Sequence, residues 1–145
     1  MKVAVNPSYE IDIHVSPVST IDTVDFENLQ FGKVFTDHMF EADYIDGKWT
    51  NCAIKPLTKL QLHPATSALH YGQAIFEGMK AFKNQEGKAR LFRPDANLHR
   101  LNESCRRMAI PEVPEELFMN ALFNLVRIEQ NWIPDTEDGS MYIRP

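Results

Sequence analysis

The stretch MKAFKNQEGKARLFRPDANLHRLNESCRRM, residues 79–108, contains two strand-like segments followed by the first turns of a helix. Apolar residues alternate with polar ones on both sides of the turn-forming sequence NQEG, at Met79, Ala81, Ala89 and Leu91. Such alternation places one face of each strand in a core, and the short connection between the segments predicts a β-hairpin.

Two helices are predicted to follow this hairpin. Pro94 suits a first helical turn because its missing N–H would be unpaired there, and apolar residues then recur at steps of three and four, at Leu98, Leu101, Cys105 and Met108. A second helix is predicted from Pro114, where Glu115 and Glu116 favour the positive end of the helix dipole. Strands followed by helices predict an α+β fold, in which an antiparallel sheet with hairpins is packed by these two main helices.

A second hairpin is predicted at Asp46 and Gly47, because Asp-Gly suits a two-residue turn whose central residues both have positive φ. Residues 1–30 are polar and lack a strong period, and we interpret them as an arm laid over the domain. The domain itself is predicted to span residues 31–145. A chain of 145 residues is about one lobe of an enzyme that holds a small metabolite between two lobes.

The charge balance argues against two classes of partner. With 15 Lys plus Arg against 20 Asp plus Glu, the net charge of -5 offers no general attraction to nucleic acid or to an anionic membrane. No apolar run approaches the roughly 18 residues that span a bilayer, and the N-terminus lacks a secretory signal, so we expect a cytoplasmic protein. Cys52 and Cys105 fit no metal-ligand spacing, so we expect reduced thiols and no metal site.

Three features suggest chemistry. The segment LHPATSALHYGQAIFEGMKAF, residues 62–82, places Tyr71 and Phe76 near glycines, where they can line a pocket, although a packed core connection has the same composition. Arg100 emerges at the flank of its helix's buried stripe, where a guanidinium can grip a phosphate or remain a solvated surface group. In the strand predicted for MYIRP, Tyr142 and Arg144 share a face, which suits a carboxylate and equally an edge strand in solvent.

Four separated motifs occur in a defined order: FGKVFTDHMF (31–40), LHPATSALHYGQAIFEGMKAFK (62–83), RLFRPDANLHRLNESCRRM (90–108) and MYIRP (141–145). In this order and spacing they resemble the N-terminal domain of the branched-chain amino acid aminotransferases, which are pyridoxal-phosphate enzymes of fold type IV. The resemblance implies the small domain of that fold and transfer of the amino group of Leu, Ile or Val to 2-oxoglutarate. It also implies a homodimer whose small-molecule partners are amino acids and 2-oxo acids.

The resemblance implies roles for six residues. Arg100, in NLHRL, corresponds to the arginine that holds the phosphate of the pyridoxal 5'-phosphate cofactor. The other five correspond to substrate-pocket residues and are Phe31, Tyr71, Phe76, Tyr142 and Arg144. Among them, Tyr71 helps to complete the pocket of the neighbouring subunit, Tyr142 binds the substrate carboxylate, and Arg144 lies near the entrance.

No catalytic residue is expected within this chain, because in the family the lysine that forms the Schiff base lies in a larger C-terminal domain beyond the YIRP motif. We therefore expect these 145 residues to be one lobe of a truncated enzyme and inactive alone. Two alternatives remain open. One is another fold type IV enzyme, such as a D-amino acid aminotransferase or aminodeoxychorismate lyase, and the other is a non-enzymatic, stand-alone binding or assembly domain.

Overall fold

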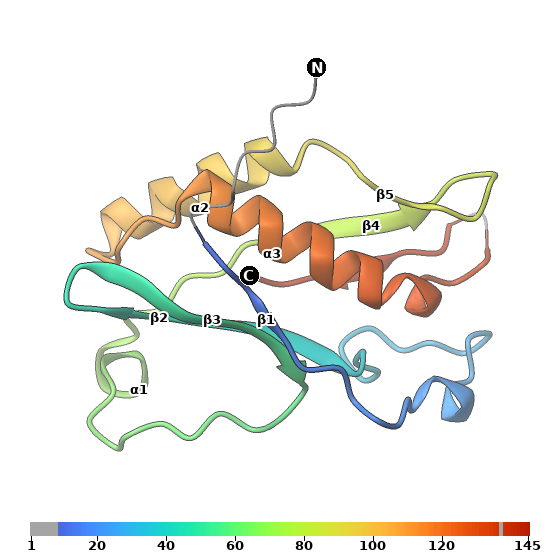
Figure 1. Ribbon diagram of the computed structural model, residues 1–145, viewed down its shortest axis with the longest axis horizontal. Coiled ribbons are helices and arrows are strands. Elements are labelled where there is room, and N and C mark those ends of the chain that lie inside the picture. Colours follow the sequence, from blue (N-terminus) through green and yellow to red (C-terminus); the bar gives the residue numbers. More distant parts are fainter. Residues whose placement is uncertain (1–8, 137) are drawn as a thin grey trace.

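The computed structural model describes residues 9–136 and 138–145 and confirms the expected α+β class. Figure 1 shows α2 and α3 in the upper half of the molecule with β4 and β5, and the sheet of β1, β2 and β3 below them. The strands are β1 (Asp12–Ile13), β2 (His38–Ile45), β3 (Lys48–Pro56), β4 (Met79–Lys83), β5 (Ala89–Leu91) and β6 (Met141–Ile143). The helices are α1 (Ser67–Tyr71), α2 (Pro94–Arg107) and α3 (Glu115–Ile128), with short 3-10 turns at Ile21–Thr23 and Gln130–Trp132.

The first sheet has the strand order β1-β3-β2 and is built on the predicted Asp-Gly hairpin. Asp46 and Gly47 have φ values of 50° and 78°, which are the positive values that the two-residue turn requires. β1 pairs with β3 in parallel, so this sheet is not wholly antiparallel as the sequence predicted. A strand that arrives from far along the chain is not bound to the antiparallel direction that a tight turn imposes.

The second sheet has the order β5-β4-β6, with both pairs antiparallel, and it decides where the site lies. One face packs on the two long helices, in a core formed by Met79, Ala81, Leu98, Leu101, Phe118, Leu122, Val126 and Ile133. The side chains that alternate with Met79 and Ala81, beginning with Lys80, point to the opposite face. Among the described residues, both long helices pack on the first face, and we call this second face the outer face.

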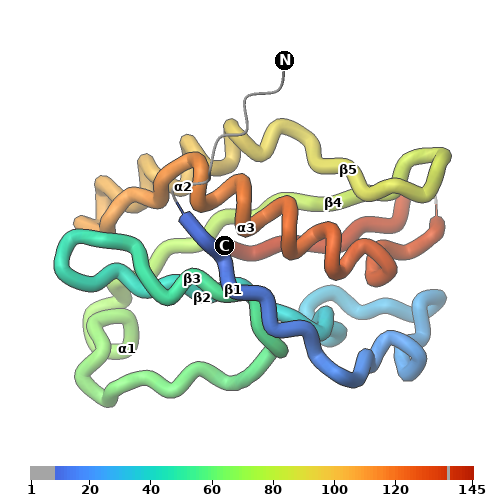
Figure 2. The backbone as a smooth tube through the Cα atoms, in the orientation of Figure 1, coloured from blue at the N-terminus to red at the C-terminus, as the bar shows by residue number. Residues whose placement is uncertain are grey.

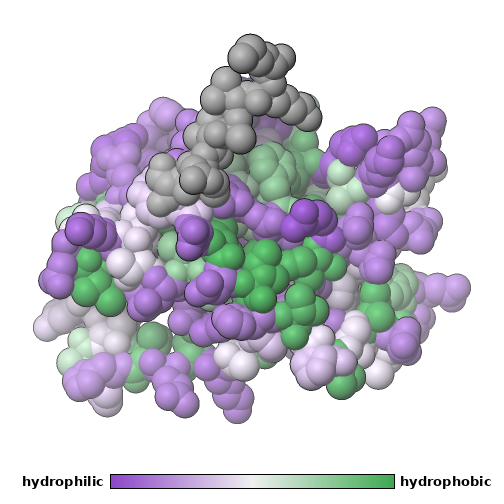
Figure 3. Space-filling view, viewed as in Figure 1, coloured by the Kyte–Doolittle hydropathy of each residue, from purple (hydrophilic) through white to green (hydrophobic). Residues whose placement is uncertain are grey.

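The two predicted helices are present with their expected starts. α2 begins at Pro94, and Pro114 immediately precedes α3, whose first turn carries Glu115 and Glu116. Five residues of α3 are buried, namely Leu117, Phe118, Ala121, Leu122 and Val126, whereas Glu115, Phe123 and Arg127 are exposed. Figure 3 shows a band of apolar surface across the middle of this side of the molecule, bordered by hydrophilic residues.

The segment before β2 is fixed to the first sheet by several polar contacts. The backbone N–H of His14 donates to the Ile54 carbonyl over 2.8 Å, and that of Ser16 donates to Nε2 of His38 over 2.8 Å. The Asp37 carboxylate accepts hydrogen bonds from the Ser19 hydroxyl and from Thr20. Figure 2 shows this segment leaving β1, looping outward and returning to β2. Among the described residues, no helix is long and apolar enough to cross a membrane.

Candidate functional site

Three of the predicted substrate residues lie together on the outer face. Tyr142 pairs with Lys80 across β6 and β4, so both side chains point away from the helices. The rings of Phe31 and Tyr142 meet edge to face, with centroids 5.2 Å apart. The guanidinium carbon of Arg144 lies 5.8 Å from the centroid of the Tyr142 ring, within cation–π range. The outer face therefore presents an aromatic surface, a phenol and a cation at one place.

Gly78, just before β4, provides the surface on which Tyr142 lies. A Cβ built at Gly78 would overlap the Tyr142 hydroxyl and would lie 3.0 Å from ring atoms Cε2 and Cζ. Glycine is thus needed here for space, because its backbone lets the phenol approach closely.

We expect Gly78→Ala to displace the Tyr142 ring and to lower the free energy of unfolding by about 1–2 kcal/mol, as overpacking usually does. Urea unfolding measures this loss. The double variant Gly78→Ala/Tyr142→Phe should lose less, relative to Tyr142→Phe alone, because the overlapping hydroxyl is gone. An alanine variant as stable as wild type would show that Tyr142 does not pack on residue 78.

Arg100 projects from α2 toward the residue that precedes Gly78. Its Nε donates to Oε2 of Glu77 over 2.6 Å, and its Nη2 donates to Oε1 of the same carboxylate. The side chain of Arg100 is 65% exposed, whereas that of Glu77 is only 4% exposed. Within the described part of the chain, Nη1 of Arg100 has no acceptor. The guanidinium can therefore offer donors to an anion outside the domain while it remains paired.

The Glu77 carboxylate is the buried charge of this site. Hydrogen bonds from Arg100, with further bonds from the Gly78 N–H and Asn97, hold the pKa of Glu77 below its ordinary value despite its burial. In turn, the hydrogen bonds to Glu77 and its negative charge raise the pKa of Arg100. Both groups are charged at neutral pH, so the pair is a salt bridge with one buried and one exposed end.

Two predicted site residues do not join this cluster. Tyr71, at the end of α1, is 84% exposed, and its nearest ring neighbour is His70 with centroids 6.4 Å apart. Figure 1 shows α1 on the opposite side of the β2–β3 hairpin from α2. Phe76 is 73% exposed, although it directly precedes Glu77. Phe31, at 77%, is also exposed, so three large aromatic side chains have little cover within this chain.

No protein-family model matches the chain. Among curated proteins, branched-chain-amino-acid transaminase 1 of Bacillus subtilis is 48% identical to it over 122 residues, which are 83% of this chain and 34% of that protein. The branched-chain-amino-acid aminotransferase of Helicobacter pylori is 42% identical over 126 residues, covering 86% and 37% of the two chains. This chain is homologous to branched-chain-amino-acid aminotransferases.

A third relative, the branched-chain-amino-acid aminotransferase of Mycolicibacterium smegmatis, is 46% identical to this chain over 120 residues. The aligned residues are 81% of this chain and 33% of that protein. The chain spans about a third of the length of the curated relatives it matches, and the match lies in their N-terminal part. The family resemblance inferred from four short motifs is thereby confirmed over most of the chain.

Two residues of the cluster were missed by the sequence analysis: Glu77 and Asn97. Asn97 donates from Nδ2 to Glu77 Oε1 over 3.3 Å and to the Gly78 carbonyl over 3.2 Å. The sequence feature that could have indicated Glu77 is the stretch AIFEGM, in which Glu77 is the only charged residue among apolar ones. A charge in such a run needs a partner, because an unpaired buried charge is costly.

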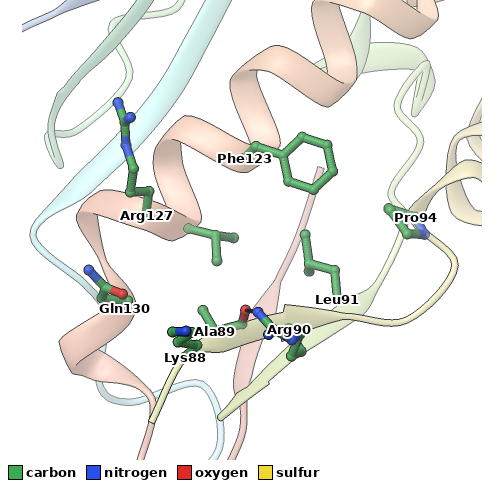
Figure 4. A pocket seen from close by; sticks show the side chains of 9 residues that line it. Lys88, Ala89, Arg90, Leu91, Pro94, Phe123, Arg127 and Gln130 are labelled. Atoms are coloured by element: carbon green, nitrogen blue, oxygen red, sulfur yellow. Dashed lines mark hydrogen bonds between the residues drawn. The ribbon is translucent and has the colours of Figure 1, made fainter. Parts of the chain in front are cut away.

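A separate depression of about 530 Å³ lies between β5 and α3. Figure 4 shows Phe123 and Leu91 pointing toward each other across it, with Lys88, Arg90 and Arg127 around it. None of the predicted site residues lines it, so it is distinct from the outer-face cluster.

Proposed function

We propose that residues 31–145 form the small N-terminal domain of a branched-chain amino acid aminotransferase, preceded by the arm expected for residues 1–30, of which residues 1–8 lie outside the described residues. The observation that carries the proposal is the meeting of Phe31, Tyr142 and Arg144 on the outer face. Homology to proteins named for this activity supports it.

We propose that Arg100 holds the phosphate of pyridoxal 5'-phosphate. The free donors at Nη1 and the exposure of the side chain fit a phosphate that approaches from outside the domain. When bound, pyridoxal phosphate supplies the electron sink that transamination requires. In our proposal this chain contributes phosphate binding, and the lysine that binds the cofactor covalently belongs to another domain.

The substrate roles follow from the same face. The Tyr142 hydroxyl donates to a substrate carboxylate, and Arg144 adds a positive charge for the second carboxylate of 2-oxoglutarate. Phe31 supplies an apolar wall that suits the side chains of Leu, Ile and Val. Tyr71 and Phe76 lie apart from the cluster, and we propose that they meet the pocket in a homodimer, where Tyr71 reaches the neighbouring subunit.

We propose the cytoplasm as the compartment. Cys52 and Cys105 are both buried and free, as thiols are in a reducing environment. The overall charge of -5 supports small-molecule substrates rather than nucleic acid or a membrane surface as partners.

An assay of two proteins tests the proposed function. The complete protein that carries this chain should transfer the amino group of L-leucine to 2-oxoglutarate, while residues 1–145 alone should show no turnover. Activity on D-alanine without activity on L-leucine would favour a D-amino acid aminotransferase. A reading frame that ends at Pro145, with no cofactor bound, would favour a non-enzymatic binding or assembly domain.

A further inference from the structure

We propose that Glu77 is a positioning residue that acts through Arg100, fixing the guanidinium so that its free donors face an incoming phosphate. The inference rests on the proposed function, since it assigns a role beside the phosphate-binding arginine. Glu77 itself does not touch the cofactor in this proposal, because its carboxylate is 4% exposed and is occupied by Arg100.

The geometry of the pair fixes the plane of the guanidinium. Nε and Nη2 of Arg100 donate to the two oxygens of one carboxylate, which is the bidentate arrangement that planar guanidinium groups prefer. Two parallel hydrogen bonds remove rotation about the last side-chain bonds. The only nitrogen left wholly free among the described contacts, Nη1, then points in one direction rather than many.

The carboxylate itself accepts two further hydrogen bonds. The Gly78 N–H donates to Oε1 over 2.7 Å, and Asn97 Nδ2 donates to the same oxygen over 3.3 Å. Asn97 lies three residues before Arg100 on α2, so both side chains reach Glu77 from the same side of that helix. The Glu77 N–H also donates to the Pro145 carbonyl over 3.0 Å. Glu77 is thus anchored both to α2 and to the end of the chain that carries Tyr142 and Arg144.

Two effects of Glu77 on phosphate affinity have opposite signs. Its negative charge repels a phosphate, whereas its hydrogen bonds preorganise the arginine that attracts one. A substitution that keeps the charge separates the two effects. Glu77→Asp retains a carboxylate but withdraws it by one methylene, so it cannot reach both Nε and Nη2 from the same backbone position.

The experiment measures dissociation constants of pyridoxal phosphate and of pyridoxal, by absorbance titration of the cofactor-free form of the complete protein. The dissociation constant of pyridoxal divided by that of pyridoxal phosphate measures how much the phosphate group adds to the affinity, and we call this quotient the ratio. We expect Glu77→Asp to reduce the preference for the phosphorylated compound about tenfold, the lower end of what partner residues contribute at metal sites. Glu112→Asp is the matched control, since Glu112 pairs with Arg106 of the same helix over 2.6 Å, and it should leave the ratio unchanged.

A double variant shows whether Glu77 acts through Arg100. In an Arg100→Gln background, Glu77→Asp should not change the ratio further, because the residue that it positions is gone. If Glu77→Asp lowers the ratio in the Arg100→Gln background as much as it does in the wild-type background, the proposal is overturned. It is also overturned if Glu77→Asp leaves the ratio unchanged while Glu77→Gln raises it. That second result would show that Glu77 acts on the phosphate through its charge alone.

A second variant tests the positioning role if Glu77→Asp fails to fold. If circular dichroism shows that Glu77→Asp does not fold, Asn97→Ala takes its place, because it removes a neutral hydrogen bond from the same carboxylate. A fall of about threefold in the ratio is then expected, and no change would overturn the positioning role. A wild-type protein with no preference for pyridoxal phosphate over pyridoxal would instead overturn the proposed function, and with it this inference.

Discussion

Replacing Glu129 by alanine is expected to lower the free energy of unfolding by roughly 3 kcal/mol. Glu129 is buried at the C-terminal end of α3, and its Oε1 accepts a hydrogen bond from Nδ1 of the buried His38. Alanine leaves the His38 N–H without this acceptor and opens a cavity around it. Urea unfolding at neutral pH measures the change, and an unaltered midpoint and slope would contradict it.

The direction of that hydrogen bond follows from the other side of the ring. The Ser16 N–H donates to Nε2 of His38 over 2.8 Å, so the proton of the neutral ring sits on Nδ1 and is donated to Glu129. The second carboxylate oxygen of Glu129, Oε2, has no hydrogen-bond partner in the described part of the chain. A buried and partly unsatisfied carboxylate makes stability depend on pH.

Burial raises the pKa of Glu129, against the opposing effect of the His38 hydrogen bond, and the charge of Asp37 adds to the increase. The folded state then binds the Glu129 proton more tightly than the unfolded state does. This contribution to stability is complete below the unfolded pKa and is lost as pH rises through the raised pKa of the folded state. Glu129→Gln removes the titration, so the variant should gain stability relative to wild type as pH rises from about 4 to about 7.

Urea unfolding of wild type and Glu129→Gln across that pH range tests the dependence. Glu86→Gln, which removes an exposed carboxylate paired with Lys88, controls for the change in net charge. A stability difference between wild type and Glu129→Gln that stays constant with pH would show that Glu129 does not titrate differently in the folded protein.

Features set by neighbouring residues were predictable from the sequence. The Asp46-Gly47 turn, the hairpin of β4 and β5, and the start of α2 at Pro94 each depend on residues within a few positions. The shared face of Tyr142 and Arg144 follows from strand geometry alone. These predictions needed no knowledge of the tertiary structure.

Features that join distant segments were not predictable from local patterns. His38 and Glu129 are 91 residues apart, and nothing near either residue indicates the other. Glu77 and Arg100 lie on different elements, so the pairing that fixes Arg100 depends on how α2 packs beside β4. Phe31 was placed beside the pocket only by the family resemblance, because its own neighbours in sequence show no period.

Arg100→Gln is expected to weaken the binding of pyridoxal phosphate to the complete protein roughly 10- to 150-fold, since charge-assisted hydrogen bonds contribute about 1.5–3 kcal/mol. Glutamine keeps a polar side chain of similar reach but loses the charge and the free donors at Nη1. Titration of the cofactor-free protein measures the dissociation constant. Arg106→Gln, at the arginine that pairs with Glu112, is the matched control and should bind the cofactor as wild type does.

Arg100→Lys separates the charge from the shape of the guanidinium. Lysine keeps the positive charge, but its single ammonium cannot pair with both oxygens of Glu77 and also present fixed donors to a phosphate. We therefore expect an affinity between those of wild type and Arg100→Gln, with the largest loss for pyridoxal phosphate and little loss for pyridoxal. If Arg100→Gln binds both compounds as wild type does, Arg100 does not hold the phosphate, and its salt bridge with Glu77 stabilises only the junction between α2 and β4.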